Sequence, residues 1–297
     1  MADLLTVYKQ YAYRLFSPIV ERYITYFESL KPDLQKANLD TSVREWVSIS
    51  LMSTLLIFVV ELPLITFILS FAGGFTFATR LLLSITISVA LAGGIFALFF
   101  FYPSLVVARR KRDIDYALPF ATLYMATTSG SNAPPQTMFR VISEFGEFGE
   151  VSREAAKIVR NMDVFGMDVV EAIRKTIEKS PSEDFKELMW GMITTITTGG
   201  NMTSYLHERA KTYMQDYRRR LDEFSERLST MLEIYLTLII VGSIFFIVLT
   251  SIMSAFGIGG GLIELIVVLQ FVVIFVGLPF VSLGFIYVLK SFSPKRS

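Results

Sequence analysis

The chain has 297 residues, of which 53% are hydrophobic, and its mean hydropathy is +0.51. This composition is too apolar for an ordinary soluble domain and predicts a membrane protein. The absence of cysteine excludes disulfides, thiolate metal sites and thiol catalysis. The net charge of +1 indicates no particular partner, and no nucleic acid is expected to bind.

Four apolar stretches are long enough to cross a bilayer as helices, which takes about 20 residues. They cover approximately 47–70, 80–102, 230–255 and 263–289. No short apolar segment follows a basic head at the N-terminus, so no cleavable signal peptide is expected. The sequence therefore predicts an all-α, multi-pass protein with two transmembrane hairpins, 47–102 and 230–297.

Basic residues are distributed unevenly around these spans. They cluster before the first span, directly after the second at Arg109, Arg110, Lys111 and Arg112, and after the fourth. The connections within the two hairpins carry none, apart from Arg80 at one edge. The positive-inside rule then places both termini and the segment 103–229 in the cytoplasm of a cell-membrane protein. Topology is enough to explain the cluster at 109–112, which is also a candidate contact for a partner.

The N-terminal region 1–46 alternates aromatic and basic residues at roughly helical spacing, as in VYKQYAYRLF and VERYITYF. This pattern fits an amphipathic helix on the inner face of the membrane. It fits equally well a soluble helix packed on the rest of the cytoplasmic region.

Glu61 lies inside the first predicted span, fourteen residues past Val47, which is about 20 Å along a helix. An intramembrane carboxylate is costly and is therefore a functional candidate. The alternative is a structural role, either a hydrogen bond between helices or a protonated carboxyl. Pro63 and, in the fourth span, Pro279 are expected to kink their helices.

The central segment shows helical periodicity, and turn signals divide it into six helices. The expected ranges are 113–129, 133–144, 149–162, 166–179, 181–198 and 201–228, the last continuing into the third span. Ser180 and Glu183 are expected to form a capping box at the start of the fifth helix. The sequence thus predicts a cytoplasmic six-helix bundle at 103–229.

One helix-ending signal occurs twice in this segment. TTSG at 127–130 and TTGG at 197–200 stand 70 residues apart, and an asparagine follows each within two positions. Gly130, Gly199 and Gly200 are expected to end helices, and Asn132 and Asn201 to cap the next ones. Two equivalent hairpins would make a bundle of two similar halves, although so few matches are also compatible with coincidence.

The chain offers few groups for catalysis. It lacks the GxxxxGK[ST] and GxSxG motifs, and the lone His207 cannot form a multi-histidine metal site, so neither catalysis nor a cofactor is expected. Some charged residues are candidates for contacts with partners. Arg218, Arg219 and Arg220 suit anionic lipid or a protein partner, and Glu147 and Glu150 lie in EFGEFGE, which suits a helix connector or a docking loop.

The stretches LPFATLYMATTSG, APPQTMFRVI, EVSREAAKIVRNMDVFGMDVVEAI, SPSEDFKELMWG and TTGGNMTSYLHERA follow one another in this order. Together they resemble the type II secretion system F domain family, and most of all its archaeal branch of platform proteins for archaella and type IV pilus-like filaments. The resemblance covers about 105–228. It implies a six-helix cytoplasmic bundle, and the positions that match the family are mostly turn residues: Pro119, Gly130, Gly166, Asp168, Gly199 and Gly200.

The resemblance also implies a role, the inner-membrane platform of a filament-assembly machine. Such a platform binds a hexameric cytoplasmic secretion ATPase and helps to move pilin-like subunits from the membrane into the filament. Many family members carry two F domains, whereas this chain carries one, so a homodimer or pairing with a second half-size F-domain protein is expected. The alternative hypothesis is an oligomeric secondary transporter that uses Glu61.

Overall fold

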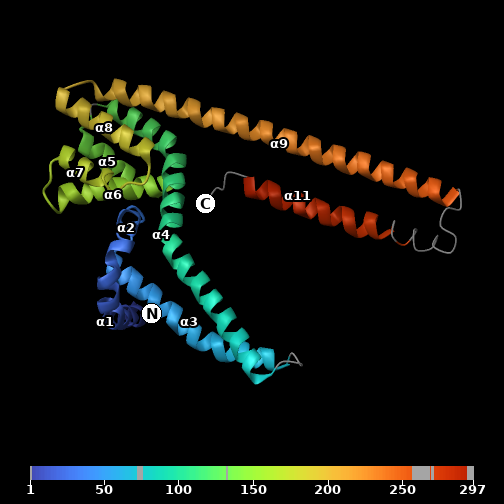
Figure 1. Ribbon diagram of the computed structural model, residues 1–297. Coiled ribbons are helices and arrows are strands. Elements are labelled where there is room, and N and C mark those ends of the chain that lie inside the picture. Colours follow the sequence, from blue (N-terminus) through green and yellow to red (C-terminus); the bar gives the residue numbers. More distant parts are fainter. Residues whose placement is uncertain (1, 72–75, 132, 256–267, 269–270, 293–297) are drawn as a thin grey trace. The chain divides into compact units, whose positions relative to one another are not determined.

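The computed structural model describes residues 2–71, 76–131, 133–255, 268 and 271–292, and all regular structure within these ranges is helical (Figure 1). The chain divides into two units, Met1–Met214 and Gln215–Ser297, each of which makes most of its contacts within itself. The helices are α1 (Ala2–Phe27), α2 (Leu30–Lys36), α3 (Val43–Phe71), α4 (Phe77–Ser129), α5 (Pro135–Glu144), the 3₁₀ turn η1 (Gly146–Phe148), α6 (Glu150–Asp163), α7 (Val169–Ile177), α8 (Glu183–Thr198), α9 (Met202–Ala255), the π-helical turn η3 (Val273–Gly277) and α11 (Leu278–Phe292).

Three of the described helices, α3, α4 and α9, are long and apolar enough to span a membrane. They contain the predicted spans 47–70, 80–102 and 230–255. The predicted span 263–289 lies partly outside the described residues, and its described part forms η3 and α11. The second span does not stop before the cytoplasmic segment, because α4 continues unbroken through the basic residues 109–112 to Ser129. The helix expected to begin at residue 113 is therefore the last third of α4.

The N-terminal part of the first unit packs around the α3–α4 hairpin. Trp46 of α3 donates from Nε1 to the carbonyl oxygen of Phe99 on α4, at 3.2 Å, and its ring stacks on Tyr102. Helix α1 packs on α3, and Val20 and Val47 belong to a small buried cluster between them. The N-terminal region was predicted either as a helix on the membrane surface or as a soluble helix on the cytoplasmic region. Neither prediction included this contact with α3.

The remaining helices of the first unit share one larger core. Each contributes side chains at helical spacing, as Ile114, Leu118, Ala121 and Met125 do from α4. The other contributors lie on α5, α6, α7, α8 and the first turns of α9. These helices begin within three residues of their expected starts, because a buried apolar stripe is a local property of a helix.

The turn residues show how these helices begin and end. Gly199 ends α8 with φ +69° and Gly166 precedes α7 with φ +65°, a region that glycine adopts most easily. Asp168 Oδ2 accepts from the backbone N–H of Val170 at 3.2 Å, and Asn201 Oδ1 accepts from that of Ser204 at 2.9 Å. Gly130 follows the end of α4 but has a right-handed conformation, with φ −63°. The predicted cap Asn132 lies outside the described residues.

One prediction about the local sequence is wrong. The capping serine of α8 is Ser182 and not Ser180, since Ser182 Oγ accepts from Phe185 N at 3.1 Å while also bonding Asp115 on α4. The 70-residue shift places the end of α4 on α8 and the start of α5 on the start of α9. It thus places the first two of the six expected helices on the last two.

Candidate functional site

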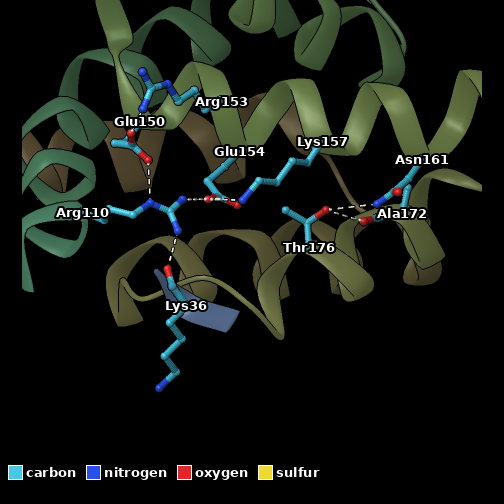
Figure 2. Close-up of polar contacts among 9 residues, drawn as sticks. All are labelled: Lys36, Arg110, Glu150, Arg153, Glu154, Lys157, Asn161, Ala172 and Thr176. Atoms are coloured by element: carbon cyan, nitrogen blue, oxygen red, sulfur yellow. Dashed lines mark hydrogen bonds and ion pairs between the residues drawn. The ribbon is translucent and has the colours of Figure 1, made fainter. Parts of the chain in front are cut away.

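A buried ion network lies where α4 leaves its apolar part. Arg110 of α4 is only 7% exposed, and Figure 2 shows its guanidinium surrounded by acceptors from two other helices. Nε donates to Glu150 Oε2 at 2.8 Å and Nη2 donates to Glu154 Oε1 at 2.5 Å, both on α6. Nη1 donates to the backbone carbonyl of Lys36, at the end of α2. One side chain therefore joins α2, α4 and α6.

The spacing on α6 creates this arrangement. Glu150 and Glu154 are four residues apart, so both point to the same side of the helix. Two cations flank them from the same helix: Arg153 bonds Glu150, and Lys157 Nζ lies 3.0 Å from Glu154 Oε1. The flanking cations add positive charge to a cluster that would otherwise hold one cation and two carboxylates.

Burial and the neighbouring cations shift the pKa of Glu150 in opposite directions. Burial by itself raises the pKa of a carboxyl group, but the hydrogen bond and charge of Arg110, together with Arg153, outweigh it and leave the pKa of Glu150 below its ordinary value. Glu154 is fully buried, and its Oε2 makes no hydrogen bond to the part of the chain described. The network therefore depends strongly on Arg110, because among the described side chains it is the one that bonds both carboxylates.

A second feature is an exposed aromatic and cationic surface on α7, α8 and the turn before α7. Val164 and Phe165 are 70% and 58% exposed, and Trp190 is 48% exposed. Lys175 Nζ lies 5.2 Å from the centre of the Phe165 ring, and Arg174 Cζ lies 5.7 Å from that of Trp190. Large apolar side chains exposed outside a membrane helix commonly mark an interaction surface. The only sequence signal for this one is a pair of apolar residues directly before Gly166.

The structure places the predicted partner residues in different settings. Arg110 and Glu150 face each other and are buried, so they are not available on the surface. The others that were predicted to meet a partner are exposed: Arg109, Lys111, Arg112, Glu147, Arg218, Arg219 and Arg220. Arg109 pairs with Asp113 at 3.8 Å, and Arg219 with Asp216 at 3.5 Å. These exposed residues lie on separate elements of the two units.

The remaining candidates, Glu61 and His207, lie on different helices. Glu61 is half-buried on α3, and its Oε2 has no hydrogen-bond partner within the described ranges. His207 is exposed on α9, with Nδ1 3.0 Å from the carbonyl oxygen of Thr203. No group of three or more potential metal ligands occurs among the described residues.

Comparison with known proteins points to one family. Residues 121–250 match type II secretion system (T2SS), protein F. Two uncharacterized proteins of Methanocaldococcus jannaschii are 25% identical over 134 residues and 29% identical over 108 residues, which is 45% and 36% of this chain. The flagella accessory protein J of the same archaeon is 23% identical over 135 residues, 45% of this chain. The matched parts cover 22%, 32% and 23% of these three relatives. No solved structure matches the chain.

Proposed function

We propose that this chain, which carries a T2SS protein F domain at residues 121–250, is a membrane platform protein of a filament-assembly machine related to type IV pili and archaella. The domain match carries the proposal, and the homologue named flagella accessory protein J supports it. Three helices that could span a membrane agree with such a role. The T2SS F family consists of structural platform proteins, which supports a role other than catalysis.

In this proposal the energy for assembly comes from a partner, a hexameric secretion ATPase in the cytoplasm. Helix α4 is the physical link within the first unit, because the same continuous helix runs from the apolar hairpin with α3 into the core of the F domain. A rigid-body displacement of that core would therefore move the hairpin as well. The pilin-like subunits of the filament would be lifted by this movement.

The surface formed by Val164, Phe165 and Trp190 is the docking site that we propose for the ATPase. It combines exposed aromatic groups with the cations Arg174 and Lys175, which suits a partner with apolar side chains and acidic neighbours. It lies on α7, α8 and the turn before α7, which are in the part of the chain that matches the T2SS family.

The test is co-purification of the detergent-solubilised full chain with a candidate secretion ATPase encoded near it. We expect Phe165→Ser to reduce both co-elution and any change in ATP turnover. The matched control is Leu123→Ser, which removes an exposed apolar side chain from α4 outside the proposed surface. Equal binding by both variants would reject the docking site, and the absence of binding and of any turnover change with folded wild-type protein would reject the ATPase coupling.

The proposed topology has four membrane spans, including 263–289, a cytoplasmic six-helix bundle at 103–229 and both termini in the cytoplasm. We also propose that the chain works as a homodimer or with a second F-domain protein, since one F domain is present. The chain has no cysteine, so single introduced cysteines can be labelled from either side of sealed vesicles. Labelling of a C-terminal cysteine from the outer side would contradict this topology.

A second candidate function is secondary transport through Glu61. The observation that favours it is the buried Oε2 of this carboxyl, which has no hydrogen-bond partner in the described part of the chain, on a helix that could span a membrane. Transport predicts that Glu61→Gln abolishes substrate flux into liposomes. A platform role predicts that the variant still co-purifies with its ATPase.

A further inference from the structure

Helix α1 has two apolar sides, and only one of them packs against the part of the chain that the structure describes. The packed side includes Ala12 and Val20, which are buried, and Phe27, which meets the rings of Phe96 and Phe100 on α4 edge-on. The second side is a stripe at intervals of three or four residues, with exposures between 46% and 80%: Val7, Tyr11, Leu15, Ile19, Tyr23 and Tyr26. A stripe of this length would be costly in contact with water.

The position of α1 along α3 indicates what covers the stripe. The helices run antiparallel: Glu21 pairs with Arg44 at 3.1 Å near the start of α3, and the hydroxyls of Tyr8 and Ser53 are 2.8 Å apart further along. Figure 1 shows α1 beside the first half of α3. The exposed apolar surface of α3 itself begins at Leu55, directly beyond the Tyr8 contact. The end of the stripe at Val7 therefore lies at the level along α3 where this exposed surface begins.

The length of α3 places this contact at the edge of a bilayer. Its 29 residues extend over about 43 Å, whereas the hydrocarbon core is about 30 Å thick. The first turns of α3, on which α1 packs, then lie at the level of the lipid headgroups.

The residue types of α1 suit that level. Tyrosine is enriched where a bilayer meets water, because its ring prefers the apolar side and its hydroxyl the wet side. Three of the six stripe residues are tyrosines. Lys9, Arg14 and Arg22 are also exposed on α1, and cations beside an apolar stripe favour anionic headgroups.

From these observations we propose that α1 is an interfacial membrane helix, with the stripe of Val7 to Tyr26 inserted among the lipids at the end of the bilayer where α3 begins. The inference does not depend on the platform function. It makes α1 a fixed part of the membrane hairpin, held at the bilayer surface, and the Arg110 contact with Lys36 then links this anchored region to the F domain.

The test uses the full chain in nanodiscs of phosphatidylcholine and phosphatidylglycerol. Because the natural sequence has no cysteine, a nitroxide can be attached to one introduced cysteine at a time. Leu15→Cys and Ile19→Cys report on the stripe. The controls are two exposed polar positions outside the stripe, Gln10→Cys on α1 and Glu28→Cys directly after its end. Collision rates are measured with oxygen, which concentrates in hydrocarbon, and with a water-soluble nickel chelate.

We expect the stripe labels to collide several-fold more often with oxygen than with the chelate, and the control labels to show the reverse. Stripe labels that collide mainly with the chelate would show a water-exposed helix and overturn the proposal. Immobile stripe labels that neither reagent reaches would overturn it too, because a second copy of the chain or another protein segment would then cover the stripe.

Discussion

Replacement of Arg110 by methionine tests the buried network most directly. The substitution keeps a side chain of similar length but leaves Glu150 and the fully buried Glu154 without their shared cation. Loss of one partner from a buried ion pair costs about 3–5 kcal/mol. Lys157 remains within 3.0 Å of Glu154, so we expect the lower part of that range. For a domain of this size the loss is a fall in melting temperature of roughly 6–12 °C.

The two tryptophans provide the assay. Trp46 lies on α3 and Trp190 on α8, so a Trp46→Phe background leaves a single fluorophore on the F domain. Thermal unfolding in detergent is then followed by Trp190 fluorescence. The matched control is Arg109→Met, next along α4, whose exposed ion pair with Asp113 is worth at most about 1 kcal/mol.

Equal melting temperatures for the Arg110→Met and Arg109→Met variants would refute the reasoning. A third variant separates the two roles of Arg110. If the cost comes from the unpaired carboxylate, adding Glu154→Leu to Arg110→Met should restore much of the stability, because well-packed apolar residues can replace buried ion pairs. If no stability returns, the loss comes from the other two bonds of Arg110, to Glu150 and to the Lys36 carbonyl.

Further predictions concern two glycines and acid stability. A Cβ at Gly191 would lie 1.9 Å from the hydroxyl oxygen of Tyr205, so Gly191→Ala should cost about 1–3 kcal/mol in circular-dichroism melts, and an unchanged melting temperature would contradict this packing. Gly199→Ala should cost about 1–2 kcal/mol because of its positive φ, whereas Gly146→Ala, which meets no atom within 4 Å, is the control and should cost less. The folded-state pKa of Glu150 is lowered, so its stabilising effect is present above its unfolded pKa and lost as the pH falls through the folded value. Glu150→Gln should therefore flatten the decline of melting temperature in acid, and an unaltered decline would exclude this carboxyl as a cause.

Much of the fold could be predicted from the sequence because its signals are local. The first three spans are continuous apolar runs, and each described helix of the core has a stripe such as Ile114, Leu118 and Met125 on a single face. The end of α8 at Gly199 was predictable because glycine is the residue that most easily adopts a positive φ, and Gly199 does so. The stretches that resemble the T2SS F family lie in this locally patterned segment, and the resemblance agrees with the match at 121–250.

The candidate sites depended on tertiary structure. In the sequence Arg110 is one of four consecutive basic residues, and nothing there distinguishes it from Arg109; only the approach of α6, 40 residues away, buries it against Glu150. The capping residue of α8 is Ser182, whose hydroxyl also bonds Asp115 of α4, 67 residues away in the chain. The stripe on α1 was also undefined, since its sequence shows apolar residues on two sides, and packing on α3 decides which side stays exposed. A periodic pattern specifies a helix and its apolar faces, but which faces and charges meet is determined by contacts between residues far apart in the chain.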